Sequence, residues 1–218
     1  MHVIRLRGVR EPIPVGKILC LGQNYAAHAR EMKSDIPSRP IVFLKPSSAI
    51  IADGDTISAP PISNEVHHEV ELVVLIGKNG KNISRESAFD YIEGYGVGLD
   101  MTLRDVQREA RNAGQPWAVS KGFDTSAPLS EFVPRAFIPD PHSLTIRLSV
   151  NGEERQHANT REMIFRIDEV ISYLSSIFTL ERGDLVYTGT PEGVGPVVSG
   201  DLLQAEIEII GTVTVHVQ

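Results

Sequence analysis

The most informative pattern of apolar and polar positions lies in residues 67–76. This segment is rich in valine and leucine and is followed by Gly77. This composition and the closing glycine predict a β-strand. Successive side chains on a strand point to opposite faces, so one face carries four apolar side chains that we assign to a core: Val70, Leu72, Val74 and Ile76. Glu69 and Glu71 lie on the other face, about 7 Å apart along the strand. The two acids therefore sit at the mouth of an otherwise apolar surface.

The remaining apolar segments predict many strands and a few short helices. Strands are expected at residues 17–21, 41–44, 94–100, 184–188, 202–210 and 212–217, and a hairpin over residues 143–157 turns at Asn151-Gly152. Helices are expected at residues 25–32, 84–91, 103–112 and 167–178. Asn24 and Ser84 are suitable caps for the first two helices. This order favours an α+β or mainly-β single domain over regular βαβ winding.

A row of glycines on the strand at residues 94–100 leads to a third acid. Gly94, Gly96 and Gly98 share one face, which Asp100 completes. Glycine weakens a strand, so three on one face indicate that another backbone or a ligand comes close. Asp100 has the position of a metal ligand at a strand end. Alternatively, Asp100 or Thr102 caps the next helix, because Thr102 precedes an acid by three residues as in a capping box.

Glu69 and Glu71 have a metal-binding and a structural interpretation. Two neighbouring anions repel each other, and each loses hydration if it is buried. A divalent cation would relieve both costs, and carboxylates suit Mg²⁺, Mn²⁺ or Ca²⁺ better than Zn²⁺. The alternative is an edge strand whose charges discourage aggregation. The spacing of the two acids alone does not decide between these interpretations.

His28 and Glu31 are separated by three residues on the first predicted helix, so they are neighbours on one face. A glutamate beside a histidine orients the imidazole and raises its basicity, which is typical of a general-base dyad. A solvated surface ion pair is the alternative interpretation. Arg104 and Gln107, in the first turns of their helix, either point donors toward the site after Asp100 or are solvated.

Two further segments supply polar groups of uncertain role. Lys121 follows a short apolar run, so it is either a snorkelling surface lysine or a cation of the site. Residues 189–195 form a glycine-rich loop after a predicted strand, and its backbone N–H groups and the Thr190 hydroxyl could hold a carboxylate. The loop is not a Walker loop, because it lacks the Gly-Lys-Ser/Thr ending, and it does not match Gly-x-Gly-x-x-Gly.

Length and composition limit the possible functions. The chain has 218 residues, which we divide into an N-terminal arm or strand (1–15) and a single catalytic domain (16–218). A net charge of −7 gives no electrostatic basis for binding nucleic acid. Cys20 is the only cysteine, so no intramolecular disulfide is possible. Without a secretory signal or a long apolar run, we expect a cytoplasmic protein that does not bind membranes.

Four motifs, taken in order, resemble the fumarylacetoacetate hydrolase family. They are Gly22-Gln23-Asn24-Tyr25-x-x-His28, His68-Glu69-Val70-Glu71-Leu72, Leu99-Asp100-Met101-Thr102-x-Arg104-Asp105-x-Gln107 and Gly189-Thr190-Pro191-x-Gly193-Val194-Gly195. Several motifs in register are far more specific than any one of them. The similarity extends over residues 16–218, and within the family the chain most resembles the short single-domain acylpyruvases that also act on oxaloacetate.

This resemblance implies a mixed β-sandwich roll, usually a homodimer, that binds Mg²⁺ or Mn²⁺. The implied metal ligands are Glu69, Glu71 and Asp100. The dyad that activates water corresponds to His28 and Glu31, with Lys121 as a further catalytic residue. The implied substrate-binding residues are Arg104, Gln107, Lys121 and Thr190.

The reaction implied by the resemblance is metal-dependent hydrolysis of the C–C bond of acylpyruvates, which gives pyruvate and a carboxylic acid. Oxaloacetate decarboxylation would pass through the same metal-bound pyruvate enolate. An alternative is an isomerase, tautomerase or decarboxylase that acts on oxaloacetate or on unsaturated 2-oxo dicarboxylic acids from aromatic catabolism. The non-enzymatic alternatives are a module that only binds a dicarboxylate and a structural domain with ordinary surface acids.

Overall fold

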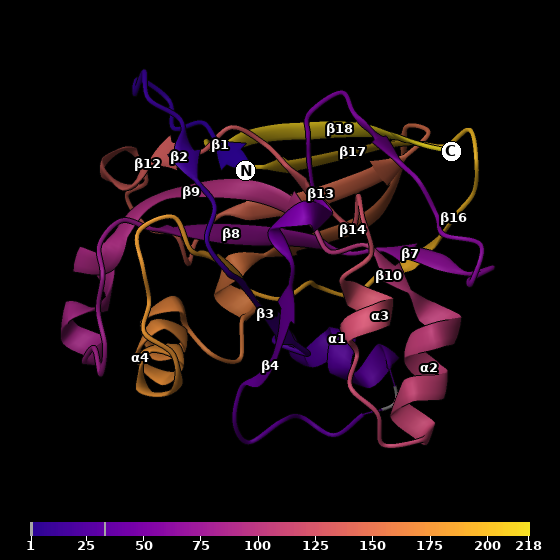
Figure 1. The fold of residues 1–218 in the computed structure, drawn as a ribbon, viewed down its shortest axis with the longest axis horizontal. Coiled ribbons are helices and arrows are strands. Elements are labelled where there is room, and N and C mark those ends of the chain that lie inside the picture. Colours follow the sequence, from indigo (N-terminus) through magenta and orange to yellow (C-terminus); the bar gives the residue numbers. More distant parts are fainter. Residues whose placement is uncertain (1, 33) are drawn as a thin grey trace.

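The computed structural model describes residues 2–32 and 34–218, in which two large β-sheets pack together beside a few short helices (Figure 1). The predicted α+β fold, a mixed β-sandwich roll, is confirmed. The α-helices are α1 (Ala26–Glu31), α2 (Arg104–Asn112), α3 (Ala118–Lys121) and α4 (Ile167–Ile177). The 3₁₀ helices are η1 (Ser47–Ala49), η2 (Arg85–Tyr91), η3 (Arg135–Phe137) and η4 (Thr160–Glu162).

The larger sheet contains eight strands and is mixed, because β3–β15 and β11–β5 pair in parallel while β8 pairs antiparallel with both neighbours. Its order is β4 (Ile41–Lys45), β3 (Ile18–Gly22), β15 (Leu185–Tyr187), β8 (Val70–Ile76), β9 (Ile92–Leu99), β11 (Ala127–Leu129) and β5 (Ile50–Ala52), with β12 (Val133–Pro134) paired to β9.

The second sheet packs on one face of the first and has five strands. Their order is β14 (Glu153–Asn159), β13 (Thr145–Val150), β17 (Leu202–Ile207), β18 (Gly211–Val217) and β6 (Thr56–Ile57). Two small sheets complete the fold. One contains β10 (Thr102–Leu103), β7 (Val66–His68) and β16 (Gly195–Val197), and the other pairs β1 (Val3–Ile4) with β2 (Ile13–Pro14).

Strand β8 is buried on both faces. Its predicted core face lies in the main core, which contains residues of both large sheets and of α4. The opposite face, with Val73 and Leu75, belongs to a second core that β1 and β2 help to cover through Ile4 and Ile13. Because β8 has paired strands on both sides, the alternative of a charged edge strand is wrong. The expected division of the chain at residue 15 stays a prediction.

At the glycine row on β9 the expected approach of another backbone occurs at Gly94, whereas side chains come close to Gly96 and Gly98. A Cβ atom at Gly94 would lie 2.6 Å from the backbone oxygen of Val133, and one at Gly98 would lie 2.6 Å from the Val73 side chain. At Gly96 the neighbour is the Phe132 ring, 3.0 Å away. These contacts let the larger sheet pack tightly on the side that leads to Asp100.

The hairpin and the last helix agree with the sequence pattern. Strands β13 and β14 pair across the predicted turn, where Asn151 and Gly152 both have positive φ, 52° and 82°. These angles are those of the tight hairpin turn that Asn-Gly favours. Helix α4 begins at Ile167 and buries the first four side chains of its predicted apolar stripe in the main core, whereas Ile177 in its last turn is 50% exposed.

Several local predictions were wrong at the ends of elements. The strand expected at 67–76 is interrupted at Glu69, which separates β7 from β8. Thr102 does not cap α2, because it lies in β10 and its hydroxyl donates to the Asp100 carbonyl over 3.1 Å. Ser84 precedes η2 without a side-chain cap. The strand expected to reach residue 210 ends at Ile207.

Asn24 is not a helix cap, because its side-chain amide nitrogen and oxygen both form hydrogen bonds to distant parts of the chain. Helix α1 has no side-chain cap. The Asn24 amide group donates to the carbonyl oxygens of Phe165 (3.0 Å) and Thr188 (2.8 Å), and its oxygen accepts from the Phe165 N–H (2.7 Å). Fully buried, Asn24 therefore joins the start of α1 to the segment before α4 and to the end of β15.

This difference between a cap and a tertiary link is testable by Asn24→Asp. Asp caps helices as well as Asn does, but here it would face two carbonyl oxygens without a donor. We expect a loss of roughly 3 kcal/mol or more in the free energy of unfolding, measured in urea. Asn159→Asp is the matched control, because Asn159 only accepts a bond from Arg161 at the start of η4. Equal stability of the two variants would contradict the assigned role of Asn24.

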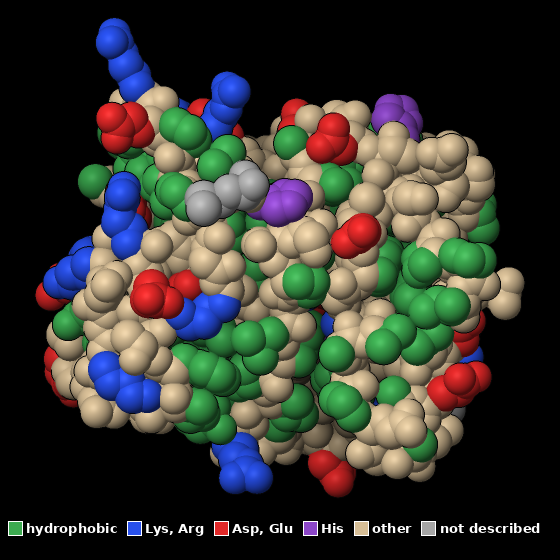
Figure 2. Space-filling view, in the orientation of Figure 1, with side chains coloured by type: hydrophobic (Ala, Val, Ile, Leu, Met, Phe, Trp, Pro, Cys, Tyr) green, Lys and Arg blue, Asp and Glu red, His purple; other side chains and the backbone are tan. Residues whose placement is uncertain are grey.

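The surface carries mixed charge. On the face shown in Figure 2, lysine and arginine side chains are scattered, several of them next to acids, and they form no continuous basic band. This distribution agrees with the acidic net charge of −7. Among the described helices, we find none whose length and apolar character would let it cross a bilayer.

Candidate active site

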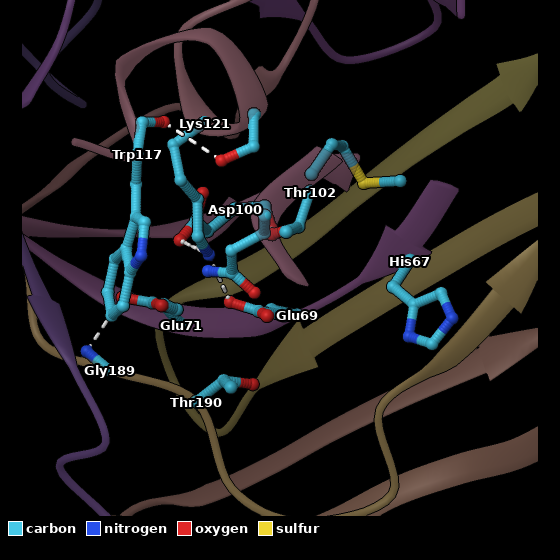
Figure 3. Close-up of polar contacts among 12 residues, drawn as sticks. His67, Glu69, Glu71, Asp100, Thr102, Trp117, Lys121, Gly189 and Thr190 are labelled. Atoms are coloured by element: carbon cyan, nitrogen blue, oxygen red, sulfur yellow. Dashed lines mark hydrogen bonds and ion pairs between the residues drawn. The ribbon is translucent and has the colours of Figure 1, made fainter. Parts of the chain in front are cut away.

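Three acids from neighbouring chain segments converge where β7 gives way to β8 and where β9 ends. Antiparallel pairing aligns Val70 with Leu99, so the residues just beyond this pair, Glu69 and Asp100, are adjacent. The Asp100 N–H donates to the Glu69 carbonyl over 2.8 Å. Carboxylate oxygens of Glu69, Glu71 and Asp100 lie within 4.8 Å of one another, and all three residues are buried (Figure 3).

Positively charged side chains surround this cluster unevenly. The Lys121 ammonium lies 2.7 Å from Glu69 and 2.5 Å from Asp100, and Arg104 also forms an ion pair with Glu69. Among the described residues no basic side chain lies within ion-pair distance of Glu71. The Glu71 carboxylate instead accepts a hydrogen bond from the Gly189 N–H over 2.7 Å.

The pKa values follow this uneven distribution. Burial works to raise the pKa of Glu69, but Lys121 and Arg104 outweigh it and hold the value well below the ordinary one. Burial raises the pKa of Glu71, and the nearby Asp100 and Glu69 carboxylates raise it further. Burial opposes the charge on Lys121, yet Asp100 and Glu69 outweigh that effect and raise its pKa. Glu71 is therefore the acid whose negative charge is offset least.

These residues fit a hard divalent cation. The site offers three carboxylates, the preferred donors for Mg²⁺, Mn²⁺ and Ca²⁺, and no thiol or imidazole among its converging atoms. The weakly compensated Glu71 points to the same conclusion, because a cation in contact with it would favour its charged form. The donor set therefore supports the metal interpretation of the acids.

Lys45 is a buried cation of the site that the sequence analysis missed. Its ammonium lies 2.7 Å from the second Asp100 oxygen. It also donates to the Lys121 carbonyl and to the carbonyl and hydroxyl of Ser126, both at 3.0 Å. Lys45 thus fixes the Asp100 carboxylate and the backbone that carries Lys121. The sequence pattern could have identified Lys45, because it follows an apolar run, as does Lys121, which was selected for that reason.

The predicted dyad forms beside the acids. His28 Nδ1 lies 3.1 Å from a Glu31 oxygen, and the other Glu31 oxygen accepts a hydrogen bond from the Gly193 N–H over 3.0 Å. Burial works to raise the pKa of Glu31, but the bonds from His28 and Gly193 lower it below its ordinary value. His28 is 5% exposed and lines the cavity above the acids, whereas 34% of the Glu31 side chain is exposed, so only the histidine of the pair is shielded from solvent.

The other predicted site residues line the same cavity. Arg104 is 6% exposed, and its guanidinium donates to the side-chain oxygen Oε1 of Gln107 over 2.6 Å, so neither is a solvated helix residue. This bond leaves the Gln107 amide N–H groups available to a ligand. Lys121 and Thr190 also contribute to the polar lining, while the Phe43 and Trp117 rings, 5.9 Å apart, form an apolar wall. The cavity combines several hydrogen-bond donors with Glu69, Glu71 and a histidine, and Asp100 lies buried next to these acids.

The glycine-rich loop acts differently from the expectation. Its N–H groups at Gly189 and Gly193 bind the protein's own carboxylates, on Glu71 and Glu31, rather than standing free for a ligand carboxylate. Thr190 accepts a hydrogen bond from Gln156, a buried residue that sequence reasoning did not select. Figure 3 shows Gly189 and Thr190 on the segment that passes beside the three acids.

A family model described as "Fumarylacetoacetate (FAA) hydrolase C-terminal" matches residues 17–218. The chain belongs to the fumarylacetoacetate hydrolase family. The oxaloacetate tautomerase FAHD1 of Mus musculus is 51% identical over 88% of this chain and 86% of the mouse protein. The human protein of the same name is 48% identical over 92% of this chain and 91% of its own length. The family resemblance predicted from the four motifs is therefore confirmed.

Solved structures of this family share the whole fold. A fumarylpyruvate hydrolase from Pseudomonas aeruginosa, in complex with Mn²⁺ and pyruvate, superposes with a TM-score of 0.95 at 41% identity, covering 99% of this chain and 95% of that one. A 5-carboxymethyl-2-hydroxymuconate delta-isomerase from Mycobacterium smegmatis gives a TM-score of 0.84 at 40% identity, over 94% of this chain and 80% of that one. The fold thus carries hydrolases and isomerases.

The charge balance of the cluster predicts opposite effects of Glu71→Gln with and without metal. The amide keeps an acceptor for the Gly189 N–H but removes repulsion among the acids, so the metal-free protein should become more stable. Mn²⁺ at 100 times its dissociation constant should stabilise the wild type by about 2.7 kcal/mol, and this gain should disappear in the variant. Thermal unfolding with and without Mn²⁺ measures both effects.

Glu206→Gln is the control, because Glu206 lies exposed on a strand of the second sheet. It should leave the stabilisation by Mn²⁺ unchanged. An undiminished Mn²⁺ effect in Glu71→Gln would show that the ion binds elsewhere.

Proposed function

We propose that this protein is a divalent-metal-dependent enzyme for small 2-oxo acids and that its main activity is keto–enol tautomerisation of oxaloacetate. The observation that carries the proposal is the His28–Glu31 dyad, hydrogen-bonded over 3.1 Å and open to the cavity that holds the acid cluster. The name and the 51% identity of the mouse relative support the choice of oxaloacetate.

In this proposal Glu69, Glu71 and Asp100 hold Mg²⁺ or Mn²⁺. The cation, when bound, supplies Lewis-acid stabilisation of negative charge on substrate oxygens. The Mn²⁺ and pyruvate in the Pseudomonas aeruginosa structure support a 2-oxo acid beside a divalent ion. The homodimer and the cytoplasmic location predicted from the sequence belong to this proposal.

The side chains of the cavity orient the substrate. Arg104 is held by Glu69 and Gln107, so its remaining N–H groups have a fixed direction. The free amide hydrogens of Gln107 and the Thr190 hydroxyl supply further donors to the substrate carboxylates. Donors that are already in place when negative charge develops lower the barrier, and a single one contributes about 3 kcal/mol. Lys121 adds its positive charge on the same side.

His28 moves the proton. With Nδ1 directed to Glu31, Nε2 is the nitrogen available to take a proton from C3 of the keto acid. Glu31 keeps the ring in place and stabilises its charged form. The proton then returns to the C2 oxygen, which completes the enol without consuming water. The reverse sequence converts the enol to the keto acid.

Acylpyruvate hydrolysis is a second candidate, favoured by the same dyad and by the likeness to a fumarylpyruvate hydrolase. Here His28 takes a proton from water, the resulting hydroxide adds to the C4 carbonyl, and the C3–C4 bond breaks to release a carboxylic acid and pyruvate. Oxaloacetate decarboxylation breaks the same bond without water. Assays with oxaloacetate, acetylpyruvate and an unsaturated 2-oxo dicarboxylate, each with Mg²⁺ and Mn²⁺, rank these activities and the isomerase alternative.

The proposal predicts a large loss of tautomerase activity in His28→Ala. A positioned general base contributes roughly 10²–10⁴-fold, so kcat for the ketonisation of enol-oxaloacetate should fall by that factor. Absorbance of the enol measures the rate. Glu31→Gln should lose less, because His28 remains in place without its carboxylate partner. Mn²⁺ affinity should be unchanged in both variants.

The control for this experiment is His216→Ala, since His216 is an exposed histidine on β18. It should retain full activity. If His28→Ala tautomerised oxaloacetate at the wild-type rate but no longer hydrolysed acetylpyruvate, the dyad would serve hydrolysis alone and the main activity proposed here would be wrong. Oxalate binding without turnover of any substrate would identify a binding module.

A further inference from the structure

Gln156 is a fully buried amide that connects the second sheet to the active site. It lies on β14, is 0% exposed, and reaches β7, β8 and the loop after β15. Its oxygen accepts from the Val70 N–H and contacts His68 Nδ1, each over 3.1 Å. Its NH₂ group donates to Thr190 Oγ1 over 2.8 Å and to the Pro191 carbonyl over 2.9 Å.

Two main-chain groups fix the direction of this amide. The Val70 N–H can only donate, and the Pro191 carbonyl can only accept. Turning the amide by 180° would place its NH₂ against an N–H and its oxygen against a carbonyl oxygen, and two buried backbone groups would lose their partners. The orientation in which Gln156 donates to Thr190 is therefore the one that the backbone permits.

This orientation determines the role of the Thr190 hydroxyl. A hydroxyl has one hydrogen, so an oxygen that accepts from Gln156 keeps its own hydrogen for another acceptor. Among the described residues no acceptor receives that hydrogen. Thr190 is 2% exposed and lines the same cavity as Arg104 and Lys121. Its hydroxyl is thus directed as a donor toward the place of the substrate.

We propose that Gln156 is a positioning residue that presets the Thr190 hydroxyl as a hydrogen-bond donor to a carboxylate or keto oxygen of the 2-oxo acid. This inference rests on the proposed function, which places the substrate against Thr190. Gln156 acts through Thr190 and does not itself touch the substrate. The site thereby favours an anionic, acceptor-only group at this position over one that carries its own hydrogens.

The test reverses the polarity of residue 156. In Gln156→Glu the carboxylate accepts the Thr190 hydrogen and leaves only a lone pair facing the cavity. Oxalate, whose adjacent carboxylates imitate the head of a 2-oxo acid, is titrated calorimetrically into the Mn²⁺-loaded protein. We expect its affinity to fall about 10- to 100-fold, as for loss of a bond to a charged group. KM for oxaloacetate should rise by a similar factor, with a smaller change in kcat.

A double-mutant cycle with Thr190→Val separates this effect from general damage. Thr190→Val should weaken oxalate binding to a similar extent. If Gln156 acts through the hydroxyl, adding Gln156→Glu to Thr190→Val should cause no further loss. If Gln156→Glu lowered oxalate affinity by the same factor in the wild type and in Thr190→Val, its role would be purely structural and the inference would be overturned. Gln204→Glu, an exposed change on β17 of the same sheet, controls for the added charge and should bind oxalate normally.

The cycle also separates the inference from the proposed function. Unchanged oxalate affinity in Thr190→Val would contradict the substrate contact itself. A loss in Thr190→Val together with normal binding in Gln156→Glu would overturn only the role of Gln156.

If Gln156→Glu fails to fold, Gln156→Met replaces it in the same cycle, since it removes the donor without adding charge. We expect a 3- to 10-fold loss for Gln156→Met, again absent in the Thr190→Val background.

Discussion

Three carboxylates held within 4.8 Å of one another are the constraint on which the rest of the structure depends. At such a separation two unit charges repel by about 3 kcal/mol even at an effective dielectric constant of 20. The fold withstands this repulsion by placing Lys121, Lys45 and Arg104 against the cluster. These cations contact Glu69 and Asp100 but leave Glu71 without a charged partner among the described residues. The uneven compensation is what makes the cluster suited to a divalent ion.

The surrounding architecture keeps these groups from moving apart. Glu71 belongs to β8, which is buried on both faces and paired on both edges. The loop after β15 uses Gly189 to hold Glu71 and Gly193 to hold Glu31, so one short segment fixes both the acid cluster and the dyad. A change that moves this loop would shift the acid cluster and the His28–Glu31 pair together. Gln156 connects the same loop to the second sheet.

The side-chain repeat of strands and helices along the sequence predicted much of the arrangement of the acids and of the His28–Glu31 pair. Strand alternation placed Glu69 and Glu71 on one face, the glycine row led to Asp100, and helical spacing paired His28 with Glu31. Each of these rests on residues close in sequence, where strand or helix geometry limits the outcome. The roles of Lys45 and Gln156 could not be predicted this way, because their partners lie 55 and 34 residues away, at Asp100 and Thr190.

Asn24 shows why a local rule fails even when it is correct on average. An asparagine before a helix gains about one hydrogen bond as a cap. In the folded chain its side chain makes three bonds to segments more than 140 residues away. Tertiary structure therefore outweighs the local preference. The interruption at Glu69 has a similar origin, since β7 and β8 pair with different strands and belong to different sheets.

If the proposed function is right, the same side chains suit both activities named among the relatives, an oxaloacetate tautomerase and a fumarylpyruvate hydrolase. Tautomerisation and hydrolysis both require a base beside a substrate whose carboxylate and keto oxygens are already neutralised. With the proposed role of His28, they differ in what its Nε2 meets, which is C3 of the substrate in one case and a water molecule in the other. The Phe43 and Trp117 rings form an apolar wall of the cavity, so in the proposed function they limit the room for water beside the bound acid. In the proposed function this wall influences which reaction occurs, whereas the acid cluster and the His28–Glu31 pair serve either one.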